Sequence, residues 1–124
     1  MKYYVGIDLG GTNIVAGVVD EEYKILSKAS VKTNCPRPAE EIMDDMAKVV
    51  FEALDKSGLS LNDIEWVGVG APGTANVETG IIEYANNLGF ENVHMVEYLQ
   101  KKINKPVHIE NDANAAAYGE FLAG

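Results

Sequence analysis

Residues 3–20, YYVGIDLGGTNIVAGVVD, decide how the fold begins. Two apolar segments rich in β-branched residues, 3–9 and 14–19, flank the pair Gly10 and Gly11. Segments of this kind favour β-strands, and glycine readily adopts the backbone angles of a tight turn. The sequence therefore predicts two antiparallel strands joined by a short glycine turn.

The rest of the chain alternates between strand and helix patterns. Residues 24–33 alternate apolar and polar side chains, which predicts a third strand with one exposed face. Residues 38–56 carry apolar residues at the spacing of one helix face, and Gly58 is suited to end that helix. The later segments are predicted as a strand at 64–71, a turn-rich stretch at 74–80, a short strand at 81–84, a polar loop at 86–89, a short helix around 96–103, a strand at 107–109 and a helix at 113–123. This order predicts an α/β fold with a mixed five-stranded sheet, three antiparallel strands followed by parallel strands, flanked by helices.

The length and charge of the chain limit what it binds. A chain of 124 residues corresponds to one globular domain. It has 19 acidic and 10 basic side chains, a net charge of −9, and one adjacent basic pair, Lys101 and Lys102. Nucleic acid backbones bind through clustered Lys and Arg, so we expect no nucleic acid partner.

The sequence shows no targeting signal and has a single cysteine. No apolar run approaches the roughly 20 residues of a membrane helix, and the start of the chain lacks the features of a signal peptide. We therefore expect a cytoplasmic protein without membrane contact. Cys35 is the single cysteine, which leaves no intrachain disulfide and no thiolate-rich zinc site, and we expect no functional role for it.

The first candidate site is the segment DLGGTN at residues 8–13. Gly10 and Gly11 allow backbone amides to approach an anion closely, and Thr12 adds a hydroxyl donor. Asp8 would then lie within reach of a phosphate-bound Mg²⁺, which binds through few carboxylates and keeps several waters. The alternative is an ordinary hairpin turn whose glycines serve only the backbone angles.

The second candidate is the segment GVGAPG at residues 68–73, which formally matches the dinucleotide pattern G-x-G-x-x-G after a strand. That interpretation requires a helix to begin at the third glycine, and residues 74–80 show no helical period. A rigid loop whose amides and Thr74 meet a polar ligand, or a plain turn, remains open.

The third candidate is the segment ENDANAA at residues 110–116, between a predicted strand and a helix of small residues. Asp112 is placed to cap that helix, or to act as a general base towards a hydroxyl that Asn111 also holds. Asn86 and Asn87 offer further amides of the kind that recognise sugar hydroxyls, unless they form a surface turn.

These motifs, in the order 8–13, 68–73, 86–89 and 110–116, resemble the ROK family of sugar kinases and repressors. The resemblance covers the whole chain and is to the N-terminal half of a bacterial glucokinase of that family. It implies a ribonuclease H-like fold of the actin-like ATPase superfamily. Residues 1–124 would form the N-terminal domain of a two-domain kinase, whose second domain is absent from this chain.

The resemblance also implies roles for particular residues. Asp8 would support Mg²⁺, in our expectation through water, and Asp112 would be the catalytic base that takes the proton of the sugar 6-hydroxyl as it attacks the γ-phosphate of ATP. The ATP phosphates would be held by Gly10, Gly11, Thr12 and Asn13. The sugar would be held by Gly73, Thr74, Asn86, Asn87, Asn111 and Asp112.

Departures from the family pattern qualify this resemblance. The second phosphate loop, the adenosine pocket and the Cys-rich zinc motif are not in this chain, so we expect no zinc site and poor catalysis from the chain alone. The sequence Asn86-Asn-Leu stands where many family glucokinases have Pro-Asn-Leu, which leaves the hexose open, with glucose favoured. The first strand has no DNA-binding winged helix before it, which favours a kinase over a non-catalytic sugar-sensing regulator.

The resemblance further implies how the chain associates. In members of the family, the last helix of the chain packs back on the N-terminal domain. We therefore expect the isolated chain to expose an apolar patch there and to self-associate, and the full protein to be a homo-oligomer.

Overall fold

The computed structural model describes residues 2–22, 24–70, 74–76, 78–85 and 88–109. Its elements, in chain order, are β1 (Tyr3–Leu9), β2 (Asn13–Asp20), β3 (Ile25–Lys32), α1 (Ala39–Ser57), the short 3₁₀ helix η1 (Leu61–Asp63), β4 (Ile64–Gly70), β5 (Thr74–Asn76), β6 (Ile81–Ala85), β7 (Phe90–His94), α2 (Met95–Ile103) and β8 (Val107–Ile109). The helix predicted at 113–123 lies outside the described residues.

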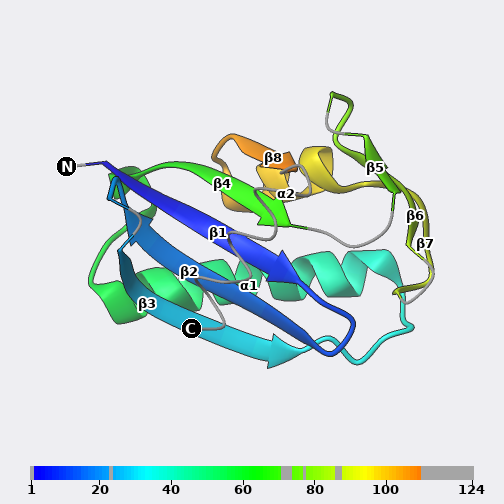
Figure 1. Cartoon of the computed structure of the whole chain (residues 1–124), viewed down its shortest axis with the longest axis horizontal. Helices are drawn as coiled ribbons and strands as arrows, with labels where there is room; N and C mark the ends of the chain where they lie inside the picture. Colours follow the sequence, from blue (N-terminus) through cyan, green and yellow to red (C-terminus); the bar gives the residue numbers. More distant parts are fainter. Residues whose placement is uncertain (1, 23, 71–73, 77, 86–87, 110–124) are drawn as a thin grey trace.

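A five-stranded sheet forms the centre of the fold, with the strand order β3-β2-β1-β4-β8 (Figure 1). The pairs β1–β2 and β2–β3 are antiparallel, and the pairs β1–β4 and β4–β8 are parallel. The predicted mixed sheet is therefore confirmed, including the three antiparallel strands at its start.

The three parallel strands align their carboxyl ends at one edge of the sheet. Ile7 pairs with Val69, and Val69 pairs with Ile109, so these residues form one row across β1, β4 and β8. All three are buried. Leu9, Gly70 and Ile109 end their strands at this edge. Leu9 and Gly70 lie within the first and second candidate segments, and Ile109 immediately precedes the third.

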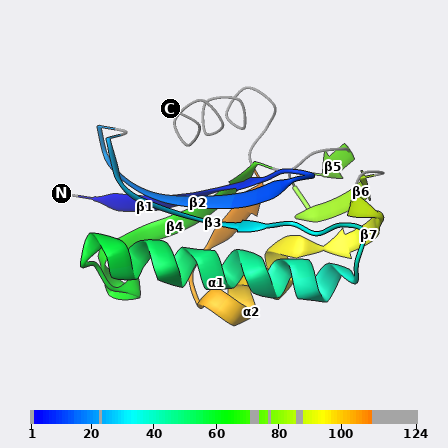
Figure 2. The ribbon, with the colours of Figure 1, turned by 90° about the horizontal axis from the view of Figure 1, so that it is seen from below.

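The described helices α1 and α2 lie on the same face of the sheet (Figure 2). The predicted apolar stripe of α1 is buried there, with Ile42, Met46 and Val50 fully inaccessible to solvent. Burial of a side chain of this size stabilises the fold by roughly 1.5–3 kcal/mol. Gly58 ends the helix with a φ of 77°, as predicted. In the described part of the chain, no helix combines the length and the apolar content that crossing a bilayer requires.

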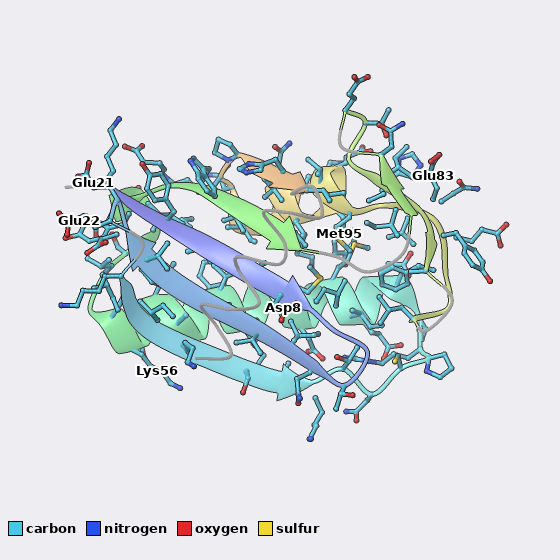
Figure 3. The ribbon with its side chains drawn as sticks, in the orientation of Figure 1. Asp8, Glu21, Glu22, Lys56, Glu83 and Met95 are labelled. Carbon is cyan, nitrogen blue, oxygen red and sulfur yellow. The ribbon has the colours of Figure 1, made fainter. Side chains whose placement is uncertain are left out.

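Strand β3 forms one edge of the sheet and is tied to α1 by side chains. Its alternating exposure confirms the predicted half-exposed strand. The Ser27 hydroxyl donates to the Ala53 carbonyl at 2.6 Å, and Lys56 Nζ donates to the Lys28 carbonyl at 3.1 Å. Figure 3 labels Lys56 where α1 passes beneath β3.

A second sheet, β5-β6-β7, differs from the prediction. Residues 74–80 were expected to be a turn-rich stretch, but β5 occupies 74–76, and no strand was expected at 90–94, where β7 lies. In β7 only Phe90 and Val93 are buried, and the left-handed Asn92, with a φ of 51°, lies between them. This spacing breaks the alternation that identifies a strand in a sequence.

Candidate functional site

Residues 10–13, the turn between β1 and β2 together with the first residue of β2, are here called the glycine loop. The Gly10 amide donates to the Asn13 carbonyl at 3.0 Å and closes the turn. A Cβ at position 10 would lie 3.1 Å from that carbonyl oxygen, which favours glycine. Gly11, Thr12 and Asn13 are exposed. The glycine loop is therefore the short, open turn that the sequence predicts, and it presents the residues expected to hold phosphate.

Residues 33–35 hold the carbonyl groups of the glycine loop. The Thr33 hydroxyl donates to the Gly10 carbonyl at 2.7 Å, and the Thr33 amide donates to the Thr12 carbonyl at 2.9 Å. The Cys35 thiol donates to the Gly11 carbonyl at 3.1 Å. Three successive carbonyls of the loop thus accept hydrogen bonds from one short segment.

Sequence reasoning missed this support. The expectation that Cys35 has no functional role did not include the contact between its thiol and the glycine loop. Thr33 is fully buried, and its hydroxyl is satisfied by a carbonyl 23 residues away. No local pattern reveals a contact over such a separation. The sequence offered one signal for Thr33, namely a hydroxyl side chain at the end of a strand that was predicted to be half exposed.

Arg37 connects this segment to α1. Its Nε donates to the Thr33 carbonyl at 2.9 Å. Its guanidinium also pairs with Asp45 and lies 3.9 Å from Glu41, both on α1. The segment that holds the glycine loop is therefore anchored to the first turns of the main helix.

Asp8 lies on β1, two residues before the glycine loop. Val5, Ile7 and Leu9 are buried beneath the sheet, and alternation places Asp8 on the face opposite α1. Figure 3 labels Asp8 near the carboxyl end of β1. The residue is half-buried, and this burial raises the pKa of its carboxyl. Among the described residues, no side chain or amide forms a hydrogen bond or ion pair with the Asp8 carboxylate.

The chemistry of Asp8 is suited to magnesium. No group of three His, Cys, Asp or Glu side chains that could hold a metal occurs within the described ranges. One half-buried carboxylate beside an anion-binding turn is the kind of protein ligand that suffices for Mg²⁺, because that ion keeps several waters and shares the substrate's phosphate oxygens. Asp8 therefore fits the expected role.

The remaining predicted residues fall mostly outside the described ranges. These are Gly73, Asn86, Asn87, Asn111 and Asp112. Thr74 is the first residue of β5. Strand β8 ends at Ile109, three residues before Asp112, at the same sheet edge as the glycine loop.

The dinucleotide interpretation of residues 68–73 is wrong. It required a helix beginning after the third glycine, whose N-terminus would meet a pyrophosphate. Residues 74–76 instead form β5, which pairs with β6 in the second sheet.

Comparison with known proteins agrees with this geometry. Residues 4–124 match the ROK family over nearly the entire chain. The chain belongs to the ROK family. The glucokinase of Streptomyces coelicolor is 41% identical over 124 residues, which cover all of this ROK chain and 37% of that protein. The chain therefore spans little more than a third of the length of this relative.

Further relatives lie in both branches of the ROK family. A crystal structure of a ROK family glucokinase from Streptomyces griseus, in complex with glucose and AMPPNP, matches with a TM-score of 0.82 and 38% identity, over 98% of this chain and 37% of that one. A xylose repressor from Caldicellulosiruptor bescii is 32% identical over 127 residues, which cover 97% of this chain and 30% of the repressor. The mixed sheet with its helices is thus the architecture of ROK kinase structures, as predicted.

Proposed function

We propose that this chain is the N-terminal part of an ATP-dependent hexose kinase that transfers the γ-phosphate of ATP to the 6-hydroxyl of the sugar, with glucose as the favoured substrate. One observation carries the proposal. The exposed glycine loop adjoins the half-buried Asp8 at the sheet edge where all three parallel strands end. The similarity to a glucokinase solved with glucose and AMPPNP supports the same assignment.

The glycine loop would hold the phosphates of ATP. Phosphoryl transfer depends mainly on positioning and on neutralising charge, so amides and hydroxyls that face an anion are the groups it needs. Gly10, Gly11, Thr12 and Asn13 would supply them, and Asp8 would hold Mg²⁺ through water. When bound, Mg²⁺ offsets the negative charge of the phosphates.

The sugar would be held by residues that follow the other two parallel strands. Asp112 would accept the proton of the 6-hydroxyl, and Asn111 would hold a neighbouring hydroxyl. Gly73, Thr74, Asn86 and Asn87 would complete the sugar site. The shared edge of β1, β4 and β8 supports this division, because the three strands end there side by side.

A matched pair of substitutions tests the proposal in the two-domain protein that we expect to contain this chain. Asp112→Asn should lower kcat by about a hundredfold or more, because general base catalysis contributes at least that much, while glucose affinity changes little. Asp55→Asn, on the exposed surface of α1, should leave both unchanged. Unchanged turnover in Asp112→Asn would exclude this residue as the base.

A second candidate function is a sugar-sensing regulator without catalysis, which the similarity to a xylose repressor favours. A regulator would bind the hexose without consuming ATP. A panel of hexoses assayed with MgATP for sugar phosphate formation separates the two functions. The missing C-terminal domain and a homo-oligomeric state are parts of the kinase proposal, and the 124-residue chain by itself should show no turnover.

A further inference from the structure

The hydrogen bonds behind the glycine loop determine which way its amides point. The peptide bonds of the loop are trans, so in each peptide unit the carbonyl and the following N–H point in opposite directions. The Gly10 carbonyl accepts from the Thr33 hydroxyl, which turns the Gly11 N–H away from Thr33. The Gly11 carbonyl accepts from Cys35, which turns the Thr12 N–H away in the same manner.

These two amides are the donors that a phosphate would need. Gly11 and Thr12 are exposed, and within the described part of the chain neither amide donates a backbone hydrogen bond. Thr33 is fully buried and its carbonyl is itself fixed by Arg37, so its hydroxyl is a rigid donor. The arrangement holds the loop with its amides turned outward before any ligand arrives.

We propose that Thr33 is a positioning residue for the phosphate site, acting through the Gly10 carbonyl, with Cys35 as a weaker second support on Gly11. This inference rests on the proposed function and extends it to residues that do not touch the nucleotide. Without the Thr33 hydroxyl, the Gly10–Gly11 peptide can rotate, and the Gly11 amide no longer faces the phosphate.

The test compares Thr33→Val, which keeps the shape of the side chain, with Thr33→Ser, which keeps the hydroxyl, in the two-domain protein. Thr33→Val should raise the KM for MgATP by about tenfold or more and leave the KM for glucose within about twofold of wild type. Thr33→Ser should restore the KM for MgATP. A role in stability alone would affect both substrates alike and would not separate the two constants.

Ser27→Ala provides the matched control. Ser27 also donates its hydroxyl to a backbone carbonyl, that of Ala53 at 2.6 Å, but it lies near the opposite end of β3 from the loop's contacts. This variant should leave the KM for MgATP unchanged. If Thr33→Val fails to fold, Cys35→Ala takes its place. Cys35→Ala should raise the KM for MgATP about threefold, which corresponds to the loss of one weak hydrogen bond. Cys35→Ser should restore the KM.

The outcomes separate this inference from the function on which it rests. If wild type turns over MgATP and Thr33→Val has the same KM for it, the positioning role is overturned and the kinase proposal stands. If wild type neither binds nor hydrolyses MgATP in the presence of any hexose, both are overturned.

Discussion

Asp8 lies directly opposite Gly70 in the parallel pair of β1 and β4. Paired residues of neighbouring strands point to the same face, so the Asp8 carboxylate stands beside a position that has no side chain. Gly70 does not have a positive φ, unlike Gly58, Gly80 and Gly89 among the described glycines. Backbone angles therefore do not require glycine at position 70. We expect that glycine keeps the space beside the Asp8 carboxylate open.

Filling that space should impair the metal and phosphate site. We expect Gly70→Val to raise the KM for MgATP by about tenfold and Gly70→Ala to have a smaller effect, because the added volume grows in that order. Steady-state kinetics of the two-domain protein at varied MgATP checks this. Equal KM values for MgATP in wild type, Gly70→Ala and Gly70→Val would mean that MgATP binding does not need the space beside Asp8.

Asp8 should reduce the stability of the chain at neutral pH. Burial raises the pKa of its carboxyl, so the folded state binds a proton more tightly than the unfolded state does. The resulting loss of stability sets in as pH rises above the ordinary pKa, is complete above the raised pKa, and disappears on acidification. Asp8→Asn should therefore raise Tm at about pH 7 and lose this advantage near about pH 3.

Thermal unfolding of the 124-residue chain at both pH values measures this difference. Asp55→Asn, which removes an exposed carboxylate from α1, is the control and should leave Tm nearly unchanged. A lower Tm for Asp8→Asn at neutral pH would show that the carboxylate has a stabilising partner.

Tyr98 controls the ionisation of Asp44 where α2 meets α1. The Tyr98 hydroxyl donates to Asp44 Oδ1 at 2.7 Å and is the main cause that lowers the pKa of the Asp44 carboxyl, while Lys102 Nζ at 3.3 Å adds to it. Tyr98→Phe should raise the pKa of Asp44, and Lys102→Gln should raise it less. Carbon-13 NMR titration of the aspartate carboxyls measures both shifts, and the reverse order would contradict this assignment.

Two glycines with nearly the same φ should respond differently to substitution. Gly58 has a φ of 77° and open space around its missing Cβ, whereas Gly80 has a φ of 74° and a Cβ there would lie 2.5 Å from Cβ of Val96. Gly58→Ala should cost about 1–2 kcal/mol for the left-handed backbone. Gly80→Ala should cost about 1–3 kcal/mol more, because it also overpacks the contact between the second sheet and α2.

Denaturant unfolding of the two variants provides the comparison. Similar free energies of unfolding for Gly58→Ala and Gly80→Ala would indicate that Val96 moves aside at little cost.

The sequence predicted those parts of the fold whose signal is local. The alternation in β3 and the helical spacing of Ile42, Met46 and Val50 depend only on neighbouring residues, so both elements were found. Strand β7 was missed because Asn92 adopts a left-handed conformation between Phe90 and Val93 and breaks the alternation there. The strand is recognised only through its pairing with β6. The second sheet thus depends on contacts that no local pattern records.

The same distinction between local and long-range signals applies to the candidate site. Asp8 and the glycine loop are contiguous in the sequence, and their residue types alone indicate an anion site. Thr33 and Cys35 reach that loop only because β3 pairs with β2 and returns its end to the turn. A residue that supports a site from behind carries no chemical signature of its own, so the structure was needed to find it.

The hydrogen bond from Lys56 to the Lys28 carbonyl bears on whether copies of the chain can aggregate through β3. β3 is an edge strand, and the unpaired carbonyls of such a strand can template the addition of a foreign strand. A charged side chain from α1 already occupies one of these acceptors, and lysines recur at every fourth residue in and just before this strand, at positions 24, 28 and 32. Fibril-like growth through β3 would have to displace an ammonium group and bring like charges together, so this margin of the sheet is protected against aggregation.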